Sequence, residues 1–187
     1  MINRQGPKPP ENQEEGEGEG EGYGEYCAWL AETVSSFVDW NNPRQVCLLV
    51  NSATIPYPPS PAGAAARARA AMPCILKRAN SDLALNRELA VPMLVEALAK
   101  GRDTLDSKTI QSAKQTILND LHDRDVRAGT VVALGNYGGT DMIPALQEIA
   151  RSDPASAKTD SGDIWFPIRK LAAEAIAEIQ QRAQASN

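Results

Sequence analysis

The sequence predicts an all-α protein that carries an acidic N-terminal tail. Apolar residues recur at the three-and-four spacing of an amphipathic helix in successive segments between residues 27 and 183. Pro, Gly and Asp, which end or cap helices, stand between these segments. No segment shows the sustained period of two that a half-buried β-strand requires.

The acidic charge of the chain belongs to its tail. Residues 1–26 hold seven of the 24 acidic residues but only two of the 19 basic ones, which leaves 17 residues of each sign in the remainder. A segment rich in Pro, Gly and Glu cannot bury a core, so we expect the tail to be disordered, as a solubilising segment or alternatively as an acidic ligand. The neutral body lacks the broad positive surface that nucleic-acid backbones require, which disfavours nucleic-acid binding.

The cysteines and apolar runs predict a cytoplasmic protein with no membrane segment. Cys27, Cys47 and Cys74 are odd in number and widely spaced, and no histidine lies near them, so we expect buried, reduced thiols and not a zinc site. The polar first 25 residues are unlike a signal peptide, and the longest apolar run, Val46 to Val50, is far too short to span a bilayer.

The N-terminal third, residues 27–53, is expected to form two helices. The first begins near Cys27 and places Trp29 and Trp40 away from its apolar face, where they form a contact surface or are covered by a neighbouring helix. A shorter helix is predicted from Arg44 to Ser52. Residues 54–61 contain four prolines and are expected to form an extended linker, or alternatively a ligand for a proline-binding domain.

Residues 62–187 are predicted to form a domain of successive helices. The first is unusually basic, since Arg67, Arg69, Lys77 and Arg78 occur in it without an acidic residue. These four residues are candidates for binding an acidic partner, although a solvated basic face is the alternative. The predicted helices span residues 62–79, with a kink or break at Pro73, and then 89–99, 107–121, 126–137, 142–151 and 167–183.

Two internal similarities indicate a repeat. Asn86-Arg87, Val126-Arg127 and Ile168-Arg169 are 40 and 42 residues apart, and each follows a turn that contains aspartate. Residues 92–96 (PMLVE) are similar to residues 144–148 (PALQE), which lie 52 residues later. Stacked helix pairs are typical of such periods, but the two similarities imply different registers.

The stretch HDRDVRAGTVVALGNYGGTDMIPALQEIARSD, followed by PIRKLAAEAIAEI, resembles the HEAT family, in particular the short HEAT-like repeats first named from phycobilisome lyases. The resemblance covers residues 120–180, is weaker back to residue 82, and is interrupted by an insertion at residues 152–166. It implies an α-α superhelix, a short solenoid, over residues 62–187. The matching positions are Asp123, Val126, Arg127, Leu134, Gly135, Gly138, Ile143, Pro144 and Leu146.

The repeat positions have structural interpretations. We expect Arg127 and Arg169 to connect successive repeats through turn aspartates, which include Asp123 and Asp125. Small residues allow helices to approach closely, glycine suits the left-handed turn that ends a helix, and proline suits a first helical turn. These properties account for Gly135, Gly138 and Pro144.

No residues form a convincing catalytic, cofactor or metal site. His122, the only histidine, lies near Asp120, Asp123 and Asp125, but a helix-ending charge followed by capping aspartates explains the cluster better than a metal does. Gly135, Gly138 and Gly139 lack the Lys-Ser/Thr of a phosphate-binding loop.

The sequence therefore predicts a non-enzymatic interaction module or scaffold that binds a protein or peptide along stacked helices. Trp165 and Phe166, at the end of the insertion, are candidate partner-binding residues, unless their rings fold back onto the last helix. The family resemblance supplies two alternatives, which are a bilin lyase or other chromophore-handling protein and a HEAT-like nucleic-acid-binding protein of the DNA-glycosylase kind.

Overall fold

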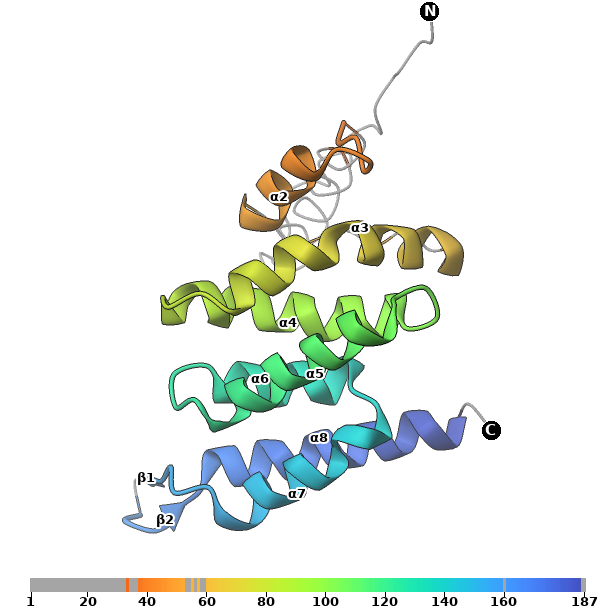
Figure 1. Cartoon of the computed structure of the whole chain (residues 1–187). Coiled ribbons are helices and arrows are strands. Elements are labelled where there is room, and N and C mark those ends of the chain that lie inside the picture. The colour runs from red at the N-terminus through yellow and green to blue at the C-terminus, as the bar shows by residue number, and fades with distance from the viewer. Residues whose placement is uncertain are drawn as a thin grey trace, which may run out of the picture.

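The computed structural model describes residues 33, 37–52, 55, 57, 60–159 and 161–185. The chain is predominantly helical, as predicted, and this part contains seven α-helices (Figure 1). They are α2 (Pro43–Ser52), α3 (Pro61–Ala79), α4 (Ala84–Gly101), α5 (Ser107–His122), α6 (Arg127–Tyr137), α7 (Ile143–Ser152) and α8 (Pro167–Ala185), with a 3-10 turn η1 (Thr140–Met142) and two short strands, β1 (Ala157–Lys158) and β2 (Ile164–Trp165). The predicted tail, Cys27 and Trp29 lie outside the described residues.

The helices are stacked in rows, with α2 at one end and α7 and α8 at the other (Figure 1). α2 packs on α3, and α3 packs on α4. Beyond them, α4 packs on α6, α6 packs on α8, and α7 pairs with α8. Each helix thus buries its apolar side against its neighbours. One core runs along the stack, and its largest fully buried side chains include Met72, Ile75, Leu94, Ile117, Leu134, Leu146 and Ile179.

Local signals explain several helix ends. Ser60 accepts a hydrogen bond from the amide of Gly63 at 3.3 Å and caps α3, whose first residue is a proline. Asp106 caps α5 by accepting from the amide of Thr109 at 3.0 Å. Pro144 lies in the first turn of α7, as expected.

Other local predictions need correction. α3 continues through Pro73, whose ring is exposed, so the helix is not split there. α4 begins five residues earlier than predicted, because Leu85 is exposed and hides the start of the apolar periodicity. Gly138 ends α6 in an extended conformation (φ −65°, ψ 151°) and not in a left-handed one, because the chain passes almost directly into η1.

Described residues in two segments that were expected to be irregular take part in the fold. Ile55, inside the predicted proline-rich linker, is buried in the core. In the insertion, β1 and β2 form an antiparallel hairpin in which Ala157 pairs with Trp165 and Lys158 with Ile164. Gly162 closes its turn with a positive φ of 89°, a conformation that favours glycine. The expectation that the chain contains no strand is wrong for this hairpin.

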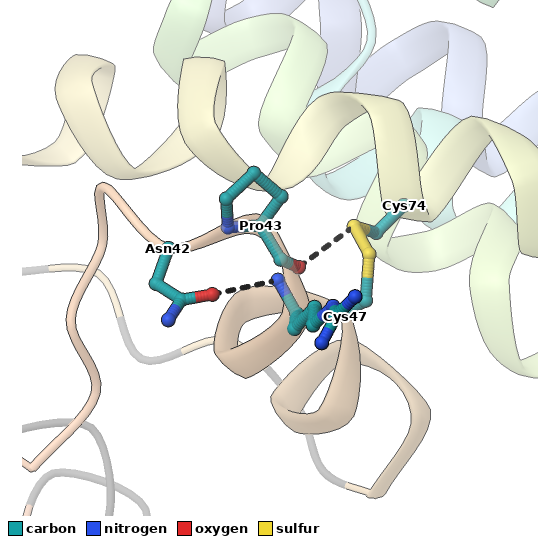
Figure 2. The surroundings of a disulfide bond; sticks show 5 residues. Asn42, Pro43, Cys47 and Cys74 are labelled. Carbon is teal, nitrogen blue, oxygen red and sulfur yellow. Dashed lines mark hydrogen bonds between the residues drawn. A yellow bond between two sulfur atoms is a disulfide. The ribbon is translucent and has the colours of Figure 1, made fainter.

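Cys47 and Cys74 form a disulfide that joins α2 to α3 (Figure 2). Their Cα atoms are 5.2 Å apart, a normal separation for a disulfide. The prediction of reduced thiols is therefore wrong for these two residues, because the packing of α2 on α3 brings together positions that are 27 residues apart. One argument for a reducing compartment is thereby lost. In the described part of the chain, every helix is too short or too polar to cross a membrane.

Candidate functional site

An open groove beside α5 is the strongest candidate for a binding site. It has a volume of about 220 Å³ and is formed by α4, α5, the end of α6 and the turn after it. We call it the charged groove, because an apolar floor is bordered by ionisable side chains. The floor consists of Val95, Leu98, Ile110, Ile117, Leu134 and Met142, and the border consists of Arg102, Lys114, Tyr137 and Asp141.

The border of the charged groove has two cations and one anion. Lys114 Nζ lies 2.5 Å from Asp141 Oδ2, and both side chains are partly exposed. Burial acts to raise the pKa of Asp141, but the hydrogen bond and charge of Lys114 and the charge of Arg102 outweigh it, so this pKa lies below its usual value. Asp141 is therefore ionised at neutral pH, and the border carries one net positive charge.

Tyr137, at the border of this groove, interacts with Glu96 and Tyr57, which do not line it. Burial raises the pKa of Glu96, although the charge of Lys100 and a hydrogen bond with Tyr137 oppose the shift. Burial and the Glu96 charge raise the pKa of Tyr137, and the same influences raise that of Tyr57. The tyrosines therefore stay protonated at neutral pH, so they can donate hydrogen bonds but do not supply a nucleophile.

Arginines near the starts of α4 and α6 contact aspartates in the last turn of a later helix or just after it. Arg87 Nη2 lies 2.5 Å from Asp123 Oδ2, and its Nε lies 3.7 Å from Asp120 Oδ1. Arg127 Nη1 lies 2.7 Å from Asp153 Oδ2 in a largely buried ion pair. These contacts join α4 to the turn after α5, and α6 to the end of α7.

The other predicted repeat positions make backbone contacts or serve helix packing, and do not form arginine–carboxylate pairs. Arg169 donates from Nε to the backbone oxygen of Asp153 at 2.7 Å and not to a carboxylate. Asp125 donates its backbone amide to Asp123 at 2.9 Å. Gly135 is packed against α8, since a Cβ atom built there would lie 3.3 Å from the Cα atom of Ala175, so it serves close helix packing.

The four basic residues of α3 do not form one surface. The Arg67 guanidinium lies 4.9 Å from the centre of the Trp40 ring, and Arg78 donates to the backbone oxygen of Val50 at 2.5 Å. Both contacts are made with α2 or the segment just before it. Arg69 and Lys77 are exposed. The structure therefore uses two of these cations to hold α2 and leaves two on the surface.

The two aromatic candidates in the insertion differ in environment. Trp165 is 42% exposed and comes after Ile164, which is 63% exposed, so β2 leaves two large apolar side chains partly open to solvent. Phe166 is half-buried, and the Arg169 guanidinium lies 3.8 Å from the centre of its ring. One ring thus faces solvent, while the other folds back onto α8.

The charged groove was missed by the sequence analysis. Its border residues lie in the turn after α4, in α5, in α6 and in η1, and none of them is a matching position of the HEAT-like stretch. Across the ranges that the structure describes, no three His, Cys, Asp or Glu side chains come close enough to hold a metal ion. His122 is exposed at the end of α5. Comparison with protein-family models, with curated proteins and with solved structures gives no significant match.

Proposed function

We propose that this protein is a non-enzymatic interaction module that binds a segment of another protein in the charged groove. The observation that supports the proposal best is the combination of an apolar floor with the exposed cation of Arg102 and the Lys114–Asp141 pair. Binding sites for peptides and small ligands typically combine apolar surface with a few polar groups that fix orientation. Helix stacks offer such surfaces along their length.

The chemistry of the groove favours a particular kind of segment. An apolar side chain of the partner would cover Leu98 and Ile110, which are only half-buried. A carboxylate next to that side chain would pair with Arg102, which has several N–H donors in a fixed plane. We therefore propose a partner segment in which an apolar residue stands directly before or after Asp or Glu.

Three features support a HEAT-like organisation for this module. Arg87 and Arg127 occupy similar positions near the starts of α4 and α6, and each pairs with an aspartate in a later turn. Gly135 allows α6 to approach α8, and Pro144 lies in the first turn of α7. We propose that these contacts repeat because each helix pair must cover the apolar face that its neighbour exposes.

A paired substitution tests the proposal. Ala99 is exposed and lines the charged groove, so Ala99→Gln fills part of it without a change to the core. Ala173→Gln, at an exposed position of α8 outside the groove, is the matched control. We expect a defined partner, purified with the native chain from its host, to be lost with Ala99→Gln and kept with Ala173→Gln. Equal recovery with both variants would exclude the charged groove as the binding site.

The exposed side chains of β2 form the competing surface in the same experiment. Trp165→Ala removes the exposed ring and leaves the charged groove unchanged. If this variant loses the partner while Ala99→Gln keeps it, the interaction belongs to the hairpin. A synthetic peptide taken from the partner should then compete only with the surface that binds it.

A further inference from the structure

The disulfide between Cys47 and Cys74 lies at the wall of an open pocket. The pocket has a volume of about 240 Å³, and both half-cystines line it. Cys74 is 8% exposed, whereas Cys47 is only half-buried. A small molecule in this pocket therefore contacts both half-cystines, of which Cys47 is the more exposed.

The charged side chains that line the pocket are all positive. Its lining includes Lys77 and Arg78 but no acidic residue, and its other polar groups are neutral side chains such as Asn51 and Ser81. Lys77 is exposed, and Arg78 uses one N–H on the backbone oxygen of Val50. Nearby cations attract anions and stabilise thiolates, which are the nucleophiles of disulfide exchange.

We propose that this pocket is a thiol–disulfide exchange site for a small anionic thiol, such as a thiol-bearing peptide with free carboxylates, and that Cys47 is the residue it modifies. The thiolate of the ligand attacks Cys47 Sγ and forms a new disulfide as the Cys47–Cys74 bond breaks. The electron pair leaves on Cys74, which takes a proton from water. One disulfide is exchanged for another, so no oxidant is consumed.

The surroundings of Cys74 stabilise the protonated thiol that the reaction produces there. Its Sγ lies 3.9 Å from the backbone oxygen of Pro43, at the start of α2 (Figure 2). A disulfide sulfur has no hydrogen to donate, but the thiol that forms after exchange can donate to this oxygen. The reaction thus ends with a buried, hydrogen-bonded thiol at Cys74 and an adduct on the more accessible Cys47.

Exchange removes only the covalent connection between α2 and α3. Val46 and Val50 remain buried against α3, and Arg78 still binds the backbone oxygen of Val50. The adduct would add anionic groups beside Lys77 and Arg78. The modified chain is therefore expected to keep α2 in place while the positive charge of this surface is reduced.

The test uses the full chain with Cys27→Ser, which leaves only the two pocket cysteines. The protein is mixed with glutathione (anionic), 2-mercaptoethanol (neutral) or cysteamine (cationic), quenched with acid, and analysed by peptide mass mapping. We expect an adduct on Cys47, and we expect the rate per thiolate to be highest for glutathione and lowest for cysteamine. In a low-salt buffer, Lys77→Gln should slow the glutathione reaction by about fivefold and leave the 2-mercaptoethanol reaction unchanged.

Arg69→Gln is the matched control, because Arg69 is an exposed cation of the same helix that does not line the pocket. It should change neither rate. An adduct on Cys74, equal rates for the three thiols, or equal effects of Lys77→Gln and Arg69→Gln would overturn the proposal.

A second variant covers the case in which the adduct is too short-lived to observe. Cys27→Ser with Cys74→Ser leaves Cys47 as a single thiol, and no second cysteine can displace an adduct. Oxidised glutathione should modify this thiol faster than cystamine does, and Lys77→Gln should remove most of the difference. If the two disulfides react equally fast, the pocket has no preference for anions and the proposal fails.

Discussion

At the residue scale, the surroundings of Asp120 disfavour its charged form. Its residue is 4% exposed, its Oδ2 atom has no hydrogen-bond partner within the described structure, and its cationic neighbour Arg87 lies closer to Asp123. Burial raises the pKa of Asp120 to about 6, with Arg87 opposing the shift and Asp123 adding to it. The folded protein therefore holds a proton here that the unfolded chain releases near pH 4.

This difference predicts a pH dependence of stability. Between about pH 4 and about pH 6 the folded state binds more protons than the unfolded state, so the free energy of unfolding falls as the pH rises. Above pH 6, where Asp120 is fully ionised in the folded protein, the loss in the free energy of unfolding reaches its full value, on the order of 1–3 kcal/mol. Asp120→Asn removes it, so the variant should gain stability over the native chain as the pH rises from 4 to 7, as measured by urea unfolding across this range.

Asp123 supplies a control with the opposite sign. A hydrogen bond from the backbone of Asp125 and the contact with Arg87 lower its pKa, although burial opposes them. Its ionised form therefore stabilises the fold above about pH 4, and Asp123→Asn should be less stable than the native chain at pH 7. That deficit should shrink below pH 4. If Asp120→Asn and Asp123→Asn shift stability in the same direction at pH 7, the different environments deduced for the two carboxylates are wrong.

At the element scale, two neighbouring aromatic residues at the end of the hairpin differ in role: Phe166 supports the fold, whereas Trp165 is exposed. Phe166 lies under the Arg169 guanidinium, which also binds the backbone oxygen of Asp153 after α7. Phe166→Ala removes the ring that this arginine covers, and we expect it to lower the free energy of unfolding by about 1–3 kcal/mol. Trp165→Ala should lower it by less than Phe166→Ala does, because Trp165 is 42% exposed.

Thermal or urea unfolding of the two variants checks this prediction. Their difference does not depend on any partner, so it also decides how the binding experiment with Trp165→Ala is interpreted. A loss of stability in Trp165→Ala as large as in Phe166→Ala would mean that the exposed ring supports the fold. Its effect on binding would then no longer indicate a contact surface.

Most helices were predictable because their signal is local. The apolar spacing that defines α5, α7 and α8 depends only on neighbours within a few turns, and their ends coincide with Asp106, Pro144 and Pro167. The start of α4 was missed for a physical reason, since its exposed leucines break the link between apolar character and burial. The extended conformation of Gly138 also depends on the 3-10 turn just after it, which a motif that ends in glycine does not specify.

Contacts between distant residues were the part that the sequence could not supply. Cys47 and Cys74 meet because α2 packs on α3, and spacing alone does not indicate which cysteines pair. The border of the charged groove combines Arg102, Lys114 and Asp141, and their proximity results from the stacking of α4, α5 and α6. Arginine–aspartate contacts were expected from the repeat, but the partner of Arg127 is Asp153, which is not one of the turn aspartates, Asp123 and Asp125, named from the sequence.

At the scale of the whole molecule, the stack contacts itself mainly between neighbouring helices. α2 packs on α3 at one end, and α7 packs on α8 at the other (Figure 1). In such an arrangement stability is a sum of local terms, and a perturbation fades with distance along the stack. The disulfide constrains one end only, where closing a loop between residues 27 positions apart is worth about 3–4 kcal/mol in the chain-entropy description.

Amide hydrogen exchange tests whether stability is local, when each end of the stack is perturbed in turn. Reduction of the Cys27→Ser chain by a dithiol should speed exchange in α2 and α3 and leave α7 and α8 unchanged, because the broken constraint lies outside their contacts. Leu146→Ala, which removes a fully buried side chain of α7, should do the reverse at a cost of about 2–5 kcal/mol. The two perturbations serve as controls for each other, since each leaves the opposite end intact. If either one speeds exchange equally in all helices, the chain unfolds as one cooperative unit, and stability that adds along the stack is the wrong description of this molecule.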